Sequence, residues 1–376
     1  MLFFRFLSNM KSNYKRLGYY IRQVDIRNRD LAVTELLGLS IAKVFISSIA
    51  NTIGTDMSNY KIVEPHQFGY GPVTSRNGDK ITIALYAGKT PCLISQAYTV
   101  FEVIDENELM PEYLMMWFRR PEFDRFARFK SHGSAREIFD WETMCDVMLP
   151  VPSIEEQRKI VAEYQAVERR IENNRQMIAK LEETAQTIYR HMFVDNIDPE
   201  NLPQDWRLGT IGEFCEIFTG KKDVNQSLSN GKYPFFSCAP EPFYSNEYIG
   251  KGPAVLIAGN GSYTGRVGYY DSRFDLYQRT YAIEIKKDSS IPISFIYWLL
   301  KSQFEPQYLG GSRGTSIPYI VRGDISDFSF YYNFNNIDEF EDIGANVLKS
   351  KLQIEKENRL LNELLSLLLS KLSKLN

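Results

Sequence analysis

The stretch that decides the fold is residues 150–193, which reads PVPSIEEQRKIVAEYQAVERRIENNRQMIAKLEETAQTIYRHMF. Pro150 and Pro152 end the preceding element, because proline lacks a backbone donor and has a fixed φ. Ser153 can then cap a helix, and Glu156 stands three residues later, where a capping box needs it. The sequence therefore predicts a helix from Ser153 to Phe193, a rod of roughly 60 Å.

The apolar residues of this stretch recur at alternating intervals of three and four, with no glycine or proline after Pro152. This spacing is typical of a coiled-coil helix with one narrow apolar seam. Asn174 interrupts the seam, and a polar residue at such a position commonly fixes the register. A seam of this length needs a partner helix. The expected seam consists of Ile160, Tyr164, Val167, Ile171, Ile178, Leu181 and Ile188.

Residues 336–376 supply the expected partner, because their apolar side chains also follow a helical spacing. Asn336 and Glu339 repeat the spacing of Ser153 and Glu156, which predicts a helix start at Asn336. Two unrelated amphipathic helices would also explain these residues taken alone. The expected seam of this helix consists of Ile354, Leu361, Leu364 and Leu368.

A sequence repeat that extends beyond the two helices favours the interpretation that they are corresponding partners and not unrelated helices. Residues of one kind recur 181 positions apart, as in Pro111 and Pro292. The chain is therefore expected to hold two half-copies, each a globular region followed by a long helix, with pseudo-two-fold symmetry. Further pairs at this interval are Thr99 and Thr280, Trp117 and Trp298, Phe123 and Phe304, Gly133 and Gly314, and Asp146 and Asp327.

These patterns predict an α+β protein in which two similar α/β domains are separated by two long antiparallel coiled-coil helices. A chain of 376 residues suits two domains of ordinary size with connectors. The expected segments are residues 1–150 (first domain), 151–195 (central helix), 196–335 (second domain) and 336–376 (C-terminal helix).

Composition excludes several classes of function. The net charge of −3 argues against a uniformly basic nucleic-acid binder, so any DNA contact must come from clustered Lys and Arg. The four cysteines have no paired spacing and there are three histidines, so neither a disulfide framework nor a metal site is expected. No apolar run approaches the length of a membrane span, and we expect a cytoplasmic protein without a membrane partner.

Catalytic motifs are missing from the sequence. Gly88-Lys89-Thr90 resembles the end of a phosphate-binding loop, but Ile83 stands where that motif needs glycine. Residues 259–261, Gly-Asn-Gly, lack a third glycine at dinucleotide spacing and are better explained as a turn. Neither a base-methylation signature nor a nuclease-like acidic cluster is present. We therefore expect no catalytic residue and no enzymatic activity in this chain.

The segment PVPSIEEQRKI (residues 150–160) resembles the central segment of type I restriction–modification specificity subunits, in which a proline pair precedes Glu-Gln and a long helix. Residues 202–206, LPQDW, resemble the entry to the second target-recognition domain of that family. Residues 60–63 and 95–101 resemble strand motifs of the first target-recognition domain of that family. The resemblance covers essentially the whole chain. Residues 333–340 depart from it, because they keep neither the proline pair nor the glutamine.

The resemblance implies a division of labour. The two target-recognition domains would each read one half of a bipartite site in double-stranded DNA, and the helices would set the spacer. Two modification subunits, which carry the methyltransferase chemistry with S-adenosylmethionine, would dock on the helices. Restriction subunits that use ATP and Mg²⁺ would complete the complex. No cofactor is expected on this chain itself.

Candidate DNA-binding residues lie in polar loops that hold a basic or amide group near a glycine. Arg and Lys can contact guanine edges or phosphates, and Asn suits adenine. Trp117 and Trp298 are expected in the core rather than against bases. The candidates are Arg76, Asn77, Lys80 and Arg136 in the first domain and Lys221, Lys222, Asn260, Tyr263, Arg266 and Arg313 in the second.

An alternative interpretation is a coiled-coil scaffold that carries two protein- or glycan-binding modules. It would explain the mildly acidic composition, but it leaves the match at residues 150–160 unexplained.

Overall fold

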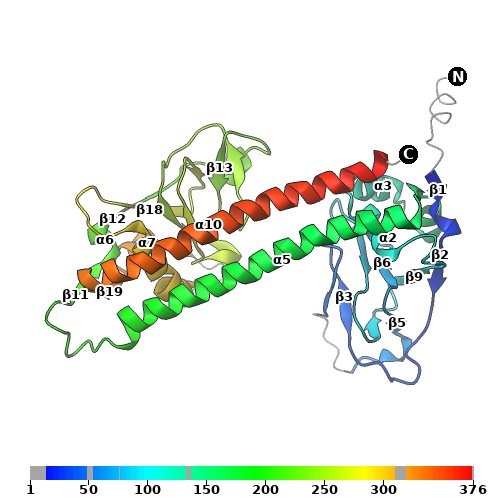
Figure 1. The fold of residues 1–376 in the computed structure, drawn as a ribbon, viewed down its shortest axis with the longest axis horizontal. Helices are drawn as coiled ribbons and strands as arrows, with labels where there is room; N and C mark the ends of the chain where they lie inside the picture. Colours follow the sequence, from blue (N-terminus) through cyan, green and yellow to red (C-terminus); the bar gives the residue numbers. More distant parts are fainter. Residues whose placement is uncertain (1–13, 49–53, 76, 133–136, 310–318, 375–376) are drawn as a thin grey trace. The chain divides into compact units, whose positions relative to one another are not determined.

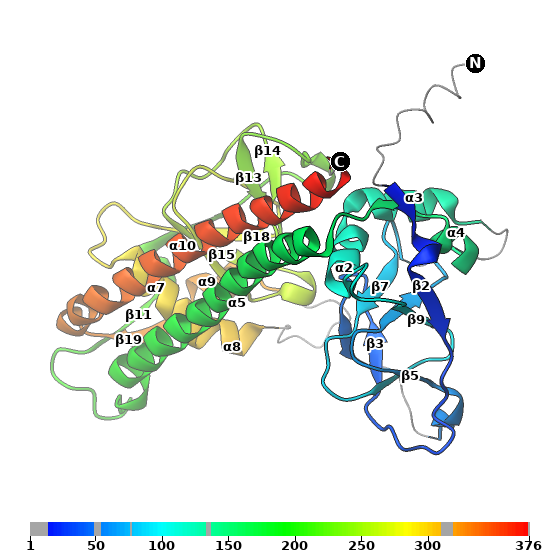
Figure 2. The same ribbon diagram turned by 45° about the vertical axis from the view of Figure 1, so that its right-hand side comes forward.

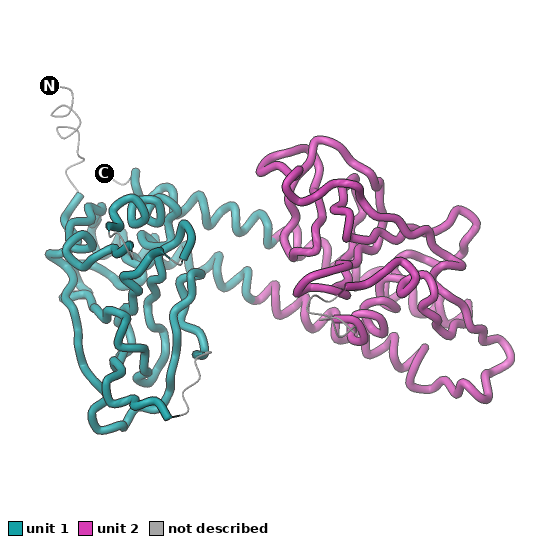
Figure 3. The backbone as a smooth tube through the Cα atoms, turned by 180° about the vertical axis from the view of Figure 1, so that it is seen from behind, with its two compact units in different colours: residues 1–172, 358–376 teal, residues 173–357 magenta. Residues whose placement is uncertain are grey.

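The computed structural model describes residues 14–48, 54–75, 77–132, 137–309 and 319–374. The chain forms two compact units, which Figure 3 colours separately. Unit 1 contains Met1–Glu172 and Asn358–Asn376, and unit 2 contains Asn173–Glu357. Each long helix therefore contributes one part to each unit.

Unit 1 is built around a four-stranded antiparallel sheet with the order β2-β9-β6-β7 (Figure 1). These strands are β2 (Ile21–Val24), β6 (Phe68–Gly71), β7 (Thr82–Leu85) and β9 (Thr99–Val103). Three strand pairs accompany it: β1 (Tyr14–Arg16) with β10 (Met148–Pro150), β3 (Leu37–Leu39) with β4 (Phe45–Ser47), and β5 (Lys61–Val63) with β8 (Cys92–Ile94).

Helix α2 (Pro111–Arg119) supplies the centre of the core of unit 1. Its side chains from Tyr113 to Phe118 are all buried, and Pro111 occupies the first turn, where its missing N–H costs nothing. Phe118 meets the ring of Phe68 edge-on, and Phe68 stacks on Phe101 at 4.7 Å between centroids. Helices α3 (Pro121–Lys130) and α4 (Trp141–Cys145) follow.

Unit 2 repeats this arrangement, with a four-stranded antiparallel sheet in the order β12-β18-β15-β16. These strands are β12 (Cys215–Thr219), β15 (Ala254–Ala258), β16 (Val267–Tyr270) and β18 (Thr280–Ile285). A second sheet joins β13 (Tyr233–Phe236), β14 (Phe243–Ser245) and β17 (Asp275–Leu276), and β11 (Arg207–Thr210) pairs with β19 (Ser329–Tyr332). The helices are α6 (Ile211–Phe214), α7 (Ile293–Leu299), α8 (Glu305–Tyr308) and α9 (Arg322–Ser326).

The internal repeat is confirmed at the level of topology. Both sheets have the same strand order, with β2, β6, β7 and β9 matching β12, β15, β16 and β18. The interval of 181 residues also relates α4 (Trp141–Cys145) to α9 (Arg322–Ser326), since 141 + 181 = 322. The two α/β domains expected from the sequence are therefore present.

The two expected rods are helices α5 (Ile154–Arg190) and α10 (Phe334–Lys371). Within unit 1, the N-terminal part of α5 shares a core with the end of α10 and the residue after it, through Val161, Tyr164, Leu369 and Leu372. Within unit 2, the end of α5 shares a core with the start of α10, through Ala185, Tyr189, Phe340 and Leu348. The helices are therefore antiparallel, as predicted.

The N-cap of α5 is confirmed, because Ser153 Oγ accepts a hydrogen bond from Glu156 N at 3.3 Å. The helix start expected at Asn336 is wrong. Helix α10 begins at Phe334, and Asn333 Oδ1 accepts from Asn336 N at 3.2 Å. Asn333 is the better cap because its Nδ2 also donates to Asp205 O at 3.1 Å, an anchor that the sequence does not show.

Most of the expected seam lies in the interior. Tyr164, Ile171 and the polar Asn174 are buried. Leu364 is 40% exposed, so its place in the seam is wrong, and Leu365 and Leu369 lie in the core of unit 1 instead. The remaining seam residues are half-buried: Ile160, Val167, Ile178, Leu181, Ile188, Ile354, Leu361 and Leu368.

The four cysteines form no disulfide. Burial raises the pKa of Cys92 and of Cys215 to about 12, so both are inert thiols at neutral pH. No group of three metal-binding side chains occurs among the described residues. No helix in the described part of the chain is long and apolar enough to cross a membrane.

A single buried amide attaches α5 to the core of unit 1. Gln157 is 0% exposed, and its Nε2 donates to Glu108 O at 2.8 Å and to Pro152 O at 3.0 Å. Its Oε1 accepts from Met110 N at 2.9 Å, the residue that precedes α2. The amide therefore joins the first turn of α5 to the first turn of α2.

We expect Gln157→Ala to destabilise the chain by about 2 kcal/mol or more. The substitution leaves Met110 N–H without its acceptor, and a buried donor without a partner costs roughly 1–3 kcal/mol. The measurement is urea denaturation followed by circular dichroism. Gln353→Ala, at an exposed position of α10, is the matched control. Equal losses for the two variants would show that the amide does not anchor the helix.

Candidate nucleic-acid interface

Strands β12 and β15 end, and β16 and β18 begin, at the same end of the sheet of unit 2. The strand pairing shows this, because Thr219 lies opposite Tyr281 and Ala258 opposite Thr280. We call the connections at this end, residues 220–222, 259–266 and 277–279, the loop end of unit 2. It brings together the predicted residues Lys221, Lys222, Asn260, Tyr263 and Arg266.

Backbone hydrogen bonds hold these loops to one another. Gln278 N donates to Lys222 O at 3.0 Å, and Gly259 N donates to Arg279 O at 2.8 Å. Ile320 N then donates to Gly259 O at 2.8 Å, beside the pairing of Asn260 with Tyr319. Side chains on the three loops therefore project from one connected support.

Lys222 has a structural role in this support. Its Nζ lies 2.7 Å from Asp275 Oδ2 and 2.7 Å from Glu247 Oε2, and it donates to Ser245 Oγ. Burial alone lowers the pKa of Lys222, but the bonds to the two carboxylates outweigh it and leave that pKa above its usual value. Its charge is therefore neutralised within the fold, whereas Lys221 is exposed.

Arg266 also has an internal role. Its Nη2 donates to Ala239 O at 2.6 Å, and its guanidinium lies 5.7 Å from the ring centroid of Tyr263. Burial lowers the pKa of Arg266. Gly265 has a φ of +86°, and a Cβ there would lie 2.6 Å from the backbone of Tyr308, so glycine is required. Arg266 thus supports Tyr263, which remains 45% exposed.

The structure adds three residues that the sequence did not single out. Gln278, Arg279 and Arg322 line a cavity of about 410 Å³ at the loop end, with Phe218 and Tyr281 as aromatic walls. Both arginines are exposed. The sequence predicts a strand from Arg279 to Ile285, and the basic residue at the start of this strand is the signal that could have identified the position; in the structure the strand begins at Thr280.

The corresponding loop end of unit 1 is described at residues 72–75 and 77–81, between β6 and β7, and at residues 131–132 and 137–138. The two segments pair, because Thr74 N donates to Glu137 O at 2.9 Å and Val73 lies opposite Ile138. Ile138 and Tyr319 are 181 positions apart. Ile138 pairs with the loop that follows β6, and Tyr319 pairs with the loop that follows β15, the strand that matches β6. The two units therefore build this end in the same way.

Two of the four candidates in unit 1 can be placed. Asn77 Nδ2 donates to Thr82 Oγ1 at 3.0 Å and to Val73 O at 3.2 Å, so this amide group shapes the turn. Lys80 is exposed and lines a cavity of about 570 Å³ with Arg125 and Phe129. The candidates Arg76, Arg136 and Arg313 lie outside the described residues.

Phe129 was not predicted as a site residue. It is 80% exposed at the end of α3, next to the exposed Lys130. An aromatic ring among cations at a loop end can contact bases or sugars as well as protein. Trp117 and Trp298 are both buried, as expected, and Trp298 Nε1 donates to Gly344 O at 2.9 Å.

Comparison with known proteins identifies the family. A family model described as the type I restriction modification DNA specificity domain matches residues 42–183 and 203–332, which is most of the chain. The specificity subunit of the type I restriction enzyme EcoDI from Escherichia coli is 42% identical over 128 residues, or 34% of this chain and 28% of that protein. The MjaIX specificity subunit from Methanocaldococcus jannaschii is 21% identical over 280 residues, or 64% of this chain and 62% of that protein.

The matched regions thus span less than two thirds of either relative. Among solved structures, the S subunit of a type I restriction–modification system from M. genitalium aligns with a TM-score of 0.59 at 16% identity. The alignment covers 97% of this chain and 96% of that one, and it shows a shared fold.

We expect Lys222→Ala to lower the free energy of unfolding by about 2 kcal/mol. A buried ion pair that loses one partner costs roughly 3–5 kcal/mol, and the partial exposure of Lys222 reduces this. Lys221→Ala, one residue away and exposed, should change stability by less than about 0.5 kcal/mol. Urea denaturation of both variants provides the measurement. Similar stabilities for the two would argue against a structural role for Lys222.

Proposed function

Because the chain belongs to the type I restriction modification DNA specificity family, we propose that it selects the DNA target of a type I restriction–modification complex. Each unit reads one half of a bipartite site in double-stranded DNA. The helices α5 and α10 set the spacer between the half-sites and bind two modification subunits. This role would place the chain in the cytoplasm.

The observation that supports this proposal best is the duplicated loop end. Two units with the same sheet topology each present polar loops at the same end of the sheet. A bipartite target requires two DNA-recognition domains, since each half-site needs its own contacts. The exposed cations Lys80, Lys221, Arg279 and Arg322 suit phosphates or guanine edges. Gln278 suits adenine.

The chemistry of the complex is assigned to other subunits. In this proposal, S-adenosylmethionine binds to the modification subunits, and ATP and Mg²⁺ bind to the restriction subunits, as the family resemblance implies. This chain contributes selection and assembly.

A surface for the modification subunits lies on α10 within unit 1. Leu360, Leu364 and Leu367 are 58%, 40% and 59% exposed. Their spacing of four and three places them on one face of the helix. An apolar stripe exposed to water is typical of a protein-binding surface. It suits a helix of a partner, which would cover the stripe by coiled-coil packing.

We expect Arg279→Ala and Arg322→Ala to weaken DNA binding by the chain assembled with its modification subunits. Each phosphate contact that is lost reduces the slope of log K against log salt by about 1. Fluorescence anisotropy over a series of salt concentrations measures this slope. Lys287→Ala is the matched control, because Lys287 is exposed at the opposite end of β18.

An unchanged slope in both arginine variants would exclude this cavity from the DNA interface. If the assembled wild-type protein binds no DNA at all, the proposed function fails, and the scaffold with protein- or glycan-binding modules becomes the better interpretation.

We expect the length of the helices to determine the spacer of the DNA site. Four residues inserted after Lys180 and four after Leu352 lengthen both helices by about 6 Å and nearly preserve the apolar stripe. Glu182 lies after the insertion in α5, and Lys351 lies before the insertion in α10, so both stay in the part of the helices that belongs to unit 2. Their ion pair is therefore kept. Because DNA rises ~3.4 Å per base pair, the half-sites should separate by one or two base pairs.

Sequencing of methylated sites in cells that carry this variant measures the spacer. The half-site sequences should stay the same, since neither loop end is altered. A methylating variant with the original spacer would show that the helices do not set the distance.

A further inference from the structure

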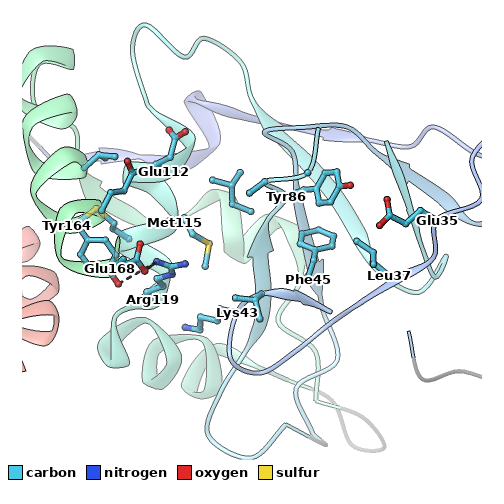
Figure 4. A pocket seen from close by; sticks show the side chains of 17 residues that line it. Glu35, Leu37, Lys43, Phe45, Tyr86, Glu112, Met115, Arg119, Tyr164 and Glu168 are labelled. Carbon is cyan, nitrogen blue, oxygen red and sulfur yellow. Dashed lines mark hydrogen bonds and ion pairs between the residues drawn. The ribbon is translucent and has the colours of Figure 1, made fainter. Parts of the chain in front are cut away.

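A cavity of about 480 Å³ in unit 1 lies away from the loop end (Figure 4). It is formed by α2, residues 161–168 of α5, the β3–β4 hairpin with Glu35 before it, and residues 85–88 at and after the end of β7. Residues 72–81 of the loop end precede β7, whereas the cavity is lined by residues at and after the end of that strand. None of the candidate DNA-binding residues lines the cavity, so the DNA-reading role does not account for it.

The floor of the cavity is apolar. Phe45, Leu85, Met115 and Met116 line it, and the side chain of Met115 points into the space in Figure 4. Methionine is flexible and polarisable, and it adapts to apolar groups of different shape. A volume of this size lies within the roughly 300–1,000 Å³ typical of ligand-binding pockets.

Both cations that line the cavity are already paired. Lys43 Nζ lies 2.8 Å from Asp124 Oδ1 and also donates to Phe118 O, and burial lowers the pKa of Lys43. Arg119 Nη1 lies 2.5 Å from Glu168 Oε1, as the dashed line in Figure 4 shows. These pairs leave no positive charge free for an anionic ligand.

Two carboxylates at the cavity remain uncompensated. Glu35 and Glu112 line it, and the side-chain carboxylate of neither has a hydrogen-bond or ion-pair partner among the described residues. Figure 4 shows them at opposite ends, on either side of Phe45 and Met115. The cavity thus combines an apolar floor with negative charge at both ends. An occupant with matching chemistry has large apolar groups flanked by positive charge.

The hairpin beside the cavity extends the apolar surface. Ile41 and Val44 are 50% and 42% exposed, and Val44 also lines the cavity. A small molecule within the cavity would leave Ile41 in water. A polypeptide that lies across the hairpin and inserts side chains into the cavity would cover both, which favours a protein partner.

We propose that this cavity, together with the β3–β4 hairpin, binds a segment of a partner subunit in which large apolar side chains are flanked by lysine or arginine. The inference rests on the proposed function, which supplies the partner, and it adds a contact on the recognition domain itself. Glu112 is half-buried, and its attraction to a basic side chain is strengthened because the effective dielectric constant there is lower than in water, whereas Glu35 is exposed.

The test uses the full chain with its modification subunit, whose affinity is measured by isothermal titration calorimetry at two salt concentrations. Glu35→Lys, Glu112→Lys and Val44→Asp should each weaken binding tenfold or more. The loss in the two charge reversals should shrink at high salt, because screening reduces both attraction and repulsion. The control is Glu142→Lys, which reverses an exposed carboxylate on α4 outside the cavity and should leave the affinity within twofold.

Affinities that match the control in all three variants would overturn the inference while the proposed function stands. Failure of the wild-type chain to bind its modification subunit would instead refute the proposed assembly, and the inference with it. A photo-crosslinking residue at Ala87, which is exposed and lines the cavity, identifies the occupant by mass spectrometry. Crosslinks to DNA, to this chain itself, or to a partner segment without a basic residue would each contradict the inference.

Discussion

The structure depends on the buried side-chain amide of Gln157. This amide makes three hydrogen bonds without access to water: to Glu108 O, to Pro152 O and from Met110 N. The N-cap residue of α2, Met110, makes no side-chain capping hydrogen bond. The acceptor for Met110 N is instead Gln157 Oε1. Because α2 is buried along most of its length, the first turn of α5 is fixed to the core of unit 1. The glutamine of the Glu-Gln pair in the segment that carries the family resemblance thus has a structural explanation.

The second copy achieves the same attachment with different side chains. Asn333 caps α10 and also binds Asp205 O, and Trp298 Nε1 on α7 donates to Gly344 O in the third turn of α10. Helix α7 lies beside α10 in both views (Figure 1 and Figure 2). A Cβ at Gly344 would lie 2.6 Å from the ring of Phe340, so glycine permits the close packing. Residues 333–340 can therefore lose the sequence motif while the helix keeps its anchor.

The features that the sequence predicted are those with a period or a repeat. The seam of α5, the antiparallel partner and the duplicated domains all follow from spacing alone, and the structure has them. The roles of individual loop residues did not follow, because they depend on partners far away in the chain. Lys222 has the same chemistry as Lys221, and only the fold places Asp275 and Glu247 beside it. Leucines lie on both the buried and the exposed side of α10. The helical spacing of Leu364 therefore did not show which of the two sides it occupies.

Ion pairs such as those of Lys222 also bear on how a chain with a net charge of −3 can present exposed basic residues. At the loop ends, the acids Asp275, Glu247 and Glu137 each bind a cation, and Lys80, Lys221, Arg279 and Arg322 are exposed. The uncompensated carboxylates of unit 1, Glu35 and Glu112, line the cavity at the end of strand β7. Unit 1 thus has the exposed Lys80 before this strand and two carboxylates without ion-pair partners at the cavity. Under the proposed function, DNA would contact the loop end, and the two carboxylates would disfavour its contact with the cavity. The cavity would then remain accessible to a basic protein segment while DNA is bound.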